Sequence, residues 1–210
     1  MKLLVLINFV LLLFINCEKK SSATAIYNPG QGGAGNATIG CTNYDYGNWE
    51  TSYYVLPYPV DISYTVNLSH CTSSYHAEGR PDQFGIDFDM PIGSLITATR
   101  EGTVIHIEES GIDGGFPNNL VVVQQNDNTY AQYMHLTENG AIVSVGDVVE
   151  KGSHIGYSGS TGLAGYPHLH FIVTIESWEY PYVGIPYNFK NTEANPHSLQ
   201  LGKSYTALPY

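Results

Sequence analysis

The segment 166–173, with the sequence YPHLHFIV, is the feature that most constrains the fold of this chain. Side chains alternate between the two faces of a β-strand, so Leu169 and Phe171 share one face while His168 and His170 share the other. The pattern predicts a strand that covers an apolar layer with one face and presents two imidazoles with the other. Imidazole is a common zinc ligand, and a pair of surface histidines is the competing interpretation.

The remainder of the chain also shows β-type patterns. From Ser52 onward, β-branched and aromatic residues are interrupted by turns, and stretches with a helical period are scarce. Segment 120–136 is typical of a hairpin. The short strands and glycine turns of 97–105 and 143–156 resemble the barrel-type pattern of lipoyl-carrier and related β folds. We predict an all-β domain, with 181–210 as a closing strand and a surface tail without chemistry.

The N-terminus has the features of an export signal. An apolar run from Leu3 to Ile15 is shorter than a bilayer span usually requires, and polar residues follow Cys17. The segment FINC resembles a bacterial lipobox, although Asn16 departs from the usual small residue before the cysteine. We therefore predict a lipoprotein signal peptide over 1–16. The protein is then exported to the bacterial cell envelope and contacts the membrane only through a lipid anchor on Cys17.

The domain boundaries follow from composition. Residues 17–51 are rich in Gly, Ser and Asn and are predicted to be a flexible tether, and 52–210 are predicted to be the folded domain. If Cys17 is lipidated, Cys41 and Cys71 remain as an even pair in a compartment that permits disulfides. The sequence leaves open whether these two cysteines are bridged.

The charge balance excludes one class of partner. The chain carries only eight Lys and Arg and a formal net charge of −11. Binding to nucleic acid depends on basic side chains that neutralise phosphates, so we expect no nucleic-acid partner. The sequence does not indicate an oligomeric state.

Further candidate ligands lie on other predicted strands and loops. Asp87 and Asp89 share one face of a predicted strand, and His135 is placed on the same face of its strand as Tyr133. His76 lies in a polar loop. An isolated aspartate is more often a solvated side chain, so the role of each group depends on which others reach it.

Together these segments resemble the lysostaphin-type, or LytM-like, zinc metallopeptidases, which cut peptide cross-links of bacterial cell walls. The resemblance covers about residues 56–208 and is carried by GIDF at 85–88, by YMHL at 133–136, and by IGYSGSTG at 155–162 leading into PHLHF at 167–171. It implies an antiparallel, barrel-like domain of the LytM, or duplicated-hybrid-motif, type.

The resemblance also implies roles for individual residues. Asp87 and His170 match two zinc ligands of the family, and His168 and His135 match its two active-site histidines that are not ligands. A zinc ion with three protein ligands keeps one position for water, as in catalytic sites. One of the two histidines is then the general base, and the other stabilises the oxyanion and protonates the leaving amine. The sequence does not say which does which.

The first ligand is where this sequence departs from the family. The usual pattern has a histidine four residues before the aspartate, and here that position is Gln83. A branch of the family has a longer loop with an earlier histidine, which His76 matches. We assign His76 as the first ligand, with His70 as the fallback. His106, His154 and His197 match no motif position and are expected to be structural or surface residues.

These expectations define a zinc endopeptidase that hydrolyses peptidoglycan peptides, with the D-Ala to diaminopimelate cross-link as the expected bond. A catalytically inactive relative that binds the wall or activates a murein amidase is the alternative. A secreted peptidase that acts on Gly-rich proteins is a third possibility.

Overall fold

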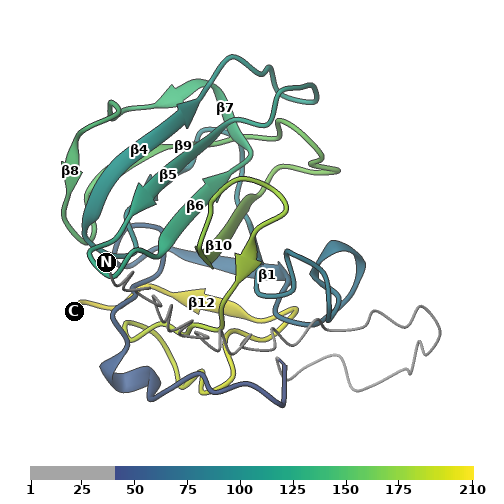
Figure 1. Cartoon of the computed structure of the whole chain (residues 1–210), viewed down its shortest axis with the longest axis vertical. Coiled ribbons are helices and arrows are strands. Elements are labelled where there is room, and N and C mark those ends of the chain that lie inside the picture. Colours follow the sequence, from purple (N-terminus) through teal and green to yellow (C-terminus); the bar gives the residue numbers. More distant parts are fainter. Residues whose placement is uncertain (1–40) are drawn as a thin grey trace, which may run out of the picture. The chain divides into compact units, whose positions relative to one another are not determined.

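The computed structural model describes residues 41–210. The predicted signal peptide, the lipidation site at Cys17 and most of the predicted tether therefore lie outside the described residues. Within 41–210 the chain forms strands and two short 3-10 turns, and no α-helix (Figure 1). The elements are η1 (Trp49–Thr51), β1 (Ser63–Leu68), η2 (Ser74–His76), β2 (Ile86–Asp89), β3 (Leu95–Thr97), β4 (Gly102–Glu108), β5 (Leu120–Gln124), β6 (Tyr130–Met134), β7 (Leu136–Ala141), β8 (Val148–Val149), β9 (His154–Ser158), β10 (Leu169–Ile175), β11 (Val183–Gly184) and β12 (Ser204–Thr206).

The strands form two antiparallel sheets. The larger sheet has the order β12-β1-β2-β10-β6-β5-β4-β8, with β11 added beside β10, and the smaller has the order β3-β9-β7. The predicted all-β, antiparallel fold is confirmed. In the described part of the chain, no helix is long and apolar enough to cross a bilayer.

Strand β10 lies near the middle of the larger sheet, between β2 and β6 (Figure 1). Leu169 and Phe171 are fully buried on its core face, as the alternation predicts. Leu169 pairs with Phe88 of β2, and Phe171 pairs with Tyr133 of β6. Burial of each such side chain stabilises the fold by about 1.5–3 kcal/mol. The core on this face therefore fixes the register that displays the polar residues of the opposite face.

For 181–210 we predicted a closing strand and a surface tail, and the strand is present as β12, which pairs with β1 at the edge of the larger sheet, but the prediction of a surface tail was wrong. Tyr187, Phe189, Leu199 and Tyr205 of this segment are buried in the main core. Prolines and polar residues hide the strand alternation here, but the aromatic rings still bury a large apolar area. The Tyr187 hydroxyl donates to the Phe171 carbonyl at 2.9 Å, so the segment is also hydrogen-bonded to β10.

The tether was predicted to extend to residue 51, but within 41–51 the side chains of Cys41 and Tyr46 are packed into the domain. Cys41 is 3% exposed and forms a disulfide with Cys71, and Tyr46 is buried. A cross-link over 30 positions reduces the entropy of the unfolded chain and stabilises the fold by about 3–4 kcal/mol. The composition placed the start of the domain too late, because two buried residues among polar neighbours produce no periodic pattern in the sequence.

The fallback ligand His70 belongs to this packed region. Its ring is fully buried, contacts the rings of Phe84 and Tyr187, and has Nδ1 at 3.1 Å from the Tyr46 hydroxyl. Burial lowers the pKa of His70 well below its usual value, and the charge of His76 adds to the shift. His70 is thus a neutral core residue.

The neutral state of His70 makes the fold sensitive to acid. Below pH about 6.5 the unfolded chain binds a proton on His70 that the folded chain excludes. The free energy of unfolding therefore decreases as the pH is lowered, by up to about 1.4 kcal/mol per pH unit. We expect the difference to appear in urea unfolding at pH 7, 6 and 5, measured with EDTA present. His70→Phe should reduce the loss at low pH, and His154→Gln, at an exposed site, should not. Equal pH dependence in His70→Phe and the wild type would contradict this.

Candidate metal centre

Asp87 and His170 meet because β2 and β10 pair in register. His170 is the Cα partner of Asp87 in this antiparallel ladder, and both side chains lie on the face opposite the core. His170 Nδ1 is 2.8 Å from Asp87 Oδ1, and both side chains are at most 8% exposed. A buried carboxylate needs partners of this kind to be retained as an ion.

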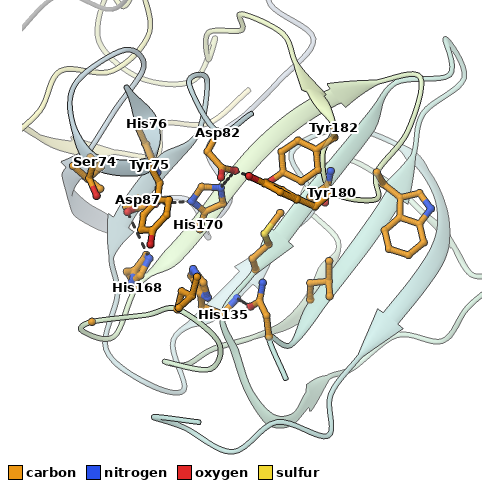
Figure 2. Close-up of a pocket in the computed structure, with 18 of the residues that line it drawn as sticks. Ser74, Tyr75, His76, Asp82, Asp87, His135, His168, His170, Tyr180 and Tyr182 are labelled. Carbon is orange, nitrogen blue, oxygen red and sulfur yellow. Dashed lines mark hydrogen bonds and ion pairs between the residues drawn. The ribbon is translucent and has the colours of Figure 1, made fainter. Parts of the chain in front are cut away.

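His76 joins this pair from a loop rather than from the sheet. It ends the turn η2 within the long connection between β1 and β2, and its N–H donates to the Ser73 carbonyl at 3.0 Å. His76 Nε2 lies 3.3 Å from Asp87 Oδ1, and its ring stands edge-on to that of His170 at 5.0 Å (Figure 2). The three side chains each offer a ligand atom, and these atoms lie within 4.8 Å of one another. Two imidazole nitrogens and one carboxylate oxygen form a donor set that suits zinc.

Gln83 is directed away from this cluster. Its side-chain oxygen accepts from the Gly79 N–H at 2.7 Å, and its amide nitrogen is 3.5 Å from the Tyr44 hydroxyl. Of the three positions considered for the first ligand, the structure brings only His76 to Asp87 and His170. Gln83 lies outside the cluster, and His70 is in the core.

His168 and His135 stand beside the cluster. His168 Nε2 is 3.6 Å from Asp87 Oδ2, and the rings of His168 and His135 are 4.6 Å apart. His168 Nδ1 contacts the Tyr166 carbonyl at 2.8 Å, and His135 Nδ1 contacts the Thr161 carbonyl at 2.7 Å. Because a carbonyl only accepts, each Nδ1 carries the proton, and each neutral ring keeps a lone pair on Nε2.

The pKa values of the histidines distinguish His135 and His168 from His170. Burial lowers the pKa of His135 to about 3, with a further contribution from His168. Burial likewise lowers the pKa of His168, although Asp87 opposes that shift. Burial also acts to lower the pKa of His170, but the carboxylates of Asp82 and Asp87 outweigh it and raise the value to about 10. At neutral pH, His135 and His168 are therefore neutral rings that can accept a proton.

Asp87 itself remains ionised. Burial acts to raise its pKa, but hydrogen bonds from His170 and His76 hold it well below the usual range. The five predicted site residues thus converge around one buried carboxylate.

His135 reaches the site in a way that strand alternation does not predict. Strand β6 ends at Met134, and His135 has φ of 65°, in the left-handed region that residues other than glycine seldom adopt. Alternation is interrupted there, so the prediction that His135 and Tyr133 share a face was wrong. Tyr133 enters the core, where its hydroxyl accepts from the Thr99 N–H, whereas His135 turns toward His168 (Figure 2).

The site opens into a cavity of about 900 Å³. Its wall includes the aromatic residues Tyr75, Phe116, Tyr166, Trp178, Tyr180 and Tyr182. Apart from the histidines, the ionisable side chains at the wall are carboxylates and tyrosines, with no Lys or Arg among the lining residues. A cavity of this size, lined by apolar and aromatic side chains with a few convergent polar groups, has the properties of a ligand-binding site.

Two polar residues of this cavity were missed by the sequence analysis. Asp82 Oδ1 is 3.4 Å from His170 Nε2, and the Tyr182 hydroxyl donates to the same carboxylate. Neither residue lies on a patterned strand, so no alternation signal identified them. Asp82 precedes Gln83 directly, and Tyr182 belongs to the segment interpreted as a tail without chemistry.

Comparisons with known proteins bear on this site. A model described as Peptidase family M23 matches residues 82–180. Lysostaphin of Staphylococcus staphylolyticus is 33% identical over 132 residues, which are 62% of this chain and 23% of that protein. Peptidoglycan DD-endopeptidase ShyA of Vibrio cholerae is 31% identical over 116 residues, 54% of this chain and 26% of that protein. The solution structure of lysostaphin has a TM-score of 0.50 and 27% identity, covering 70% of this chain and 60% of that one.

The match has defined limits. This chain spans about a quarter of the length of these curated relatives. The family match includes Asp87, His135, His168 and His170 but begins after His76. Similarity therefore covers four of the five residues, and the position of the fifth comes from the structure.

Gly85 offers a direct test of the centre. A Cβ added at Gly85 would lie 2.6 Å from His170 Cε1 and 3.1 Å from the Asp82 carbonyl oxygen, so Gly85→Ala has to displace the His170 ring. We expect the affinity for zinc, measured by chelator competition, to fall about tenfold or more. Gly165→Ala is the matched control, because a Cβ there meets no atom within 4 Å. Wild-type affinity in Gly85→Ala would show that His170 does not hold the metal.

Proposed function

The chain belongs to peptidase family M23, and from this premise we propose that it is a zinc-dependent endopeptidase that hydrolyses peptide cross-links of bacterial peptidoglycan. The observation that carries the proposal is the convergence of His76, Asp87 and His170 beside two neutral histidines in the wall of one cavity. Structural zinc sites are usually closed by four protein ligands, whereas catalytic sites keep a position for water.

We assign His76, Asp87 and His170 as the zinc ligands. Their donor set and burial support this assignment. Zinc held by these residues would polarise the scissile carbonyl and lower the pKa of a bound water. Asp87 contributes a charge that is already ionised in the folded state, and His76 and His170 contribute nitrogen donors.

His135 and His168 are assigned as the proton-transfer pair. Each ring donates Nδ1–H to a backbone carbonyl, and this fixes its orientation and leaves Nε2 as a base. One ring accepts the proton of the attacking water, and the other stabilises the oxyanion and protonates the leaving amine.

Peptidoglycan is the proposed substrate on three grounds. The cavity of about 900 Å³ is at the large end of the range for ligand sites, and the aromatic residues in its wall offer apolar contact. A relative named as a peptidoglycan DD-endopeptidase is 31% identical, which supports the D-Ala to diaminopimelate cross-link as the bond. Location in the cell envelope, with a lipid anchor on Cys17, agrees with this substrate but stays a prediction.

The assignment of the first ligand is tested by two variants. His76→Ala removes a donor from the cluster, whereas Gln83→Ala changes a side chain that points away from it. We expect the wild type and Gln83→Ala to carry one zinc ion and to release muropeptides from purified sacculi, and His76→Ala to lose both properties. If the wild type carries no zinc and releases nothing, the protein is a wall-binding or amidase-activating relative instead.

The proton-transfer pair is tested by His135→Ala and His168→Ala. We expect both variants to retain zinc, because neither ring is assigned as a ligand, while turnover falls about 10²–10⁴-fold. Zinc content by mass spectrometry and muropeptide release measured on the same samples separate the two effects. Near-normal turnover in both variants would refute the assigned role, and loss of zinc would move the residue into the ligand set.

A further inference from the structure

Asp82 lies on the opposite side of the His170 ring from the candidate metal cluster. His170 Nδ1 faces Asp87 Oδ1 at 2.8 Å, and His170 Nε2 faces Asp82 Oδ1 at 3.4 Å (Figure 2). The ring is therefore held between two carboxylates, one at each nitrogen. Only Asp87 also contacts His76.

The local chain path explains why Asp82, and not its neighbour, faces the ring. The Gln83 N–H donates to the Arg80 carbonyl at 3.1 Å, and the Gly85 N–H donates to the Asp82 carbonyl at 2.7 Å. These two turns lead into β2 and point the side chains of Asp82 and Gln83 in different directions. Asp82 enters the cavity wall at 17% exposure, while Gln83 bonds to Gly79.

Tyr182 fixes the carboxylate from the other side. Its hydroxyl donates to Asp82 Oδ1, and its ring is 8% exposed and packs with Met134 and Ile172 in a small apolar cluster on the outer face of the sheet. The hydroxyl is thus carried by a packed side chain from the connection between β10 and β11. Figure 2 shows the Asp82 carboxylate between the Tyr182 hydroxyl and the His170 ring.

The contacts of His170 bear on which of its two ring nitrogens carries the proton. A neutral imidazole carries one proton, so a ring that presents Nδ1 to a metal ion must hold its proton on Nε2. His170 Nε2 is buried and makes no hydrogen bond of standard geometry, and Asp82 Oδ1 lies beside it at 3.4 Å. A buried N–H needs an acceptor, and Asp82 is placed to become that acceptor. A carboxylate in this position fixes the tautomer and orientation of the ring and makes the other nitrogen a stronger donor.

We propose that Asp82 is a positioning residue, which accepts the Nε2 proton of His170 and so presents Nδ1 to the metal, and that Tyr182 holds the Asp82 carboxylate in place. The proposal rests on the metal centre of the proposed function. It assigns to Asp82 and Tyr182 no contact with the metal or with the substrate.

The test is the zinc dissociation constant of the mature chain, measured by chelator competition, in Asp82→Ala, Asp82→Asn and Tyr182→Phe. We expect zinc to bind about 10–100-fold more weakly to Asp82→Ala. Asp82→Asn should show a smaller loss, because its amide oxygen still accepts, and Tyr182→Phe should shift in the same direction. Asp89→Asn, an exposed site on β2, removes an equal charge and should bind zinc like the wild type.

A second readout separates positioning from a structural role. In zinc-loaded protein with isotope-labelled histidine, NMR reports which nitrogen of His170 carries the proton. We expect that proton on Nε2, with a resonance that moves in Asp82→Asn but not in Asp89→Asn. A structural role would lower the melting temperature and leave this resonance in place.

Three outcomes would overturn the proposal. They are wild-type zinc affinity in Asp82→Ala, a proton on Nδ1 in the loaded protein, and a wild type that binds no zinc. If Asp82→Ala fails to fold, the zinc affinities of Asp82→Asn and Tyr182→Phe test the proposal. Wild-type zinc affinity in both of these variants would overturn it. A protein that binds zinc through His170 but releases no muropeptides would contradict the proposed function and leave the positioning role of Asp82 intact.

Discussion

The pairing of β2 with β10 is the constraint on which the rest of the site depends. Ile86 and Phe88 face the core from β2, and Leu169 and Phe171 face it from β10, so the apolar layer fixes the register of both strands. A slip of one residue would turn the apolar side chains of one strand out of the core. The same register places polar groups opposite each other on the other face. The stability of the core and the geometry of the site are therefore set by one ladder.

The electrostatic centre of the site is one buried carboxylate. Asp87 is 4% exposed and lies within 3.6 Å of ring nitrogens from His76, His168 and His170. Burial of an unpaired carboxylate would cost several kcal/mol, so these imidazoles stabilise the ionised form of Asp87 in the folded state. The arrangement divides the histidines into two kinds. His170 is strongly paired with carboxylates, whereas His168 is bonded through its other nitrogen to a backbone carbonyl and stays neutral.

Sequence reasoning predicted those parts of the site that lie on regular strands. The alternation of His170 with Leu169 is a local property, and the β10 pairing preserved it. His135 reaches the site, but by a geometry that was not predicted, because a left-handed backbone at one position cannot be read from alternation. His76 was assigned through the family resemblance, and its place beside Asp87 depends on a loop that no pattern specifies.

The residues that escaped prediction share a physical cause. Asp82 and Tyr182 are distant in sequence, and they meet only because the connections before β2 and after β10 fold over the same edge of the cavity. The buried aromatic residues of the C-terminal segment were hidden in a similar way, since Phe189 and its neighbours are separated by polar residues and prolines. Tertiary contacts decide their burial, and propensity does not report it.

The position of His76 shows how little a donor set depends on the order of residues along the chain. The cluster constrains where three donor atoms lie in space and places no condition on where their residues fall in the sequence. A loop that reaches Asp87 from outside the sheet supplies the histidine from position 76, seven residues before Gln83. A search for ligands based on residue spacing alone would stop at Gln83, whereas a search for donor atoms in space finds His76, Asp87 and His170 together.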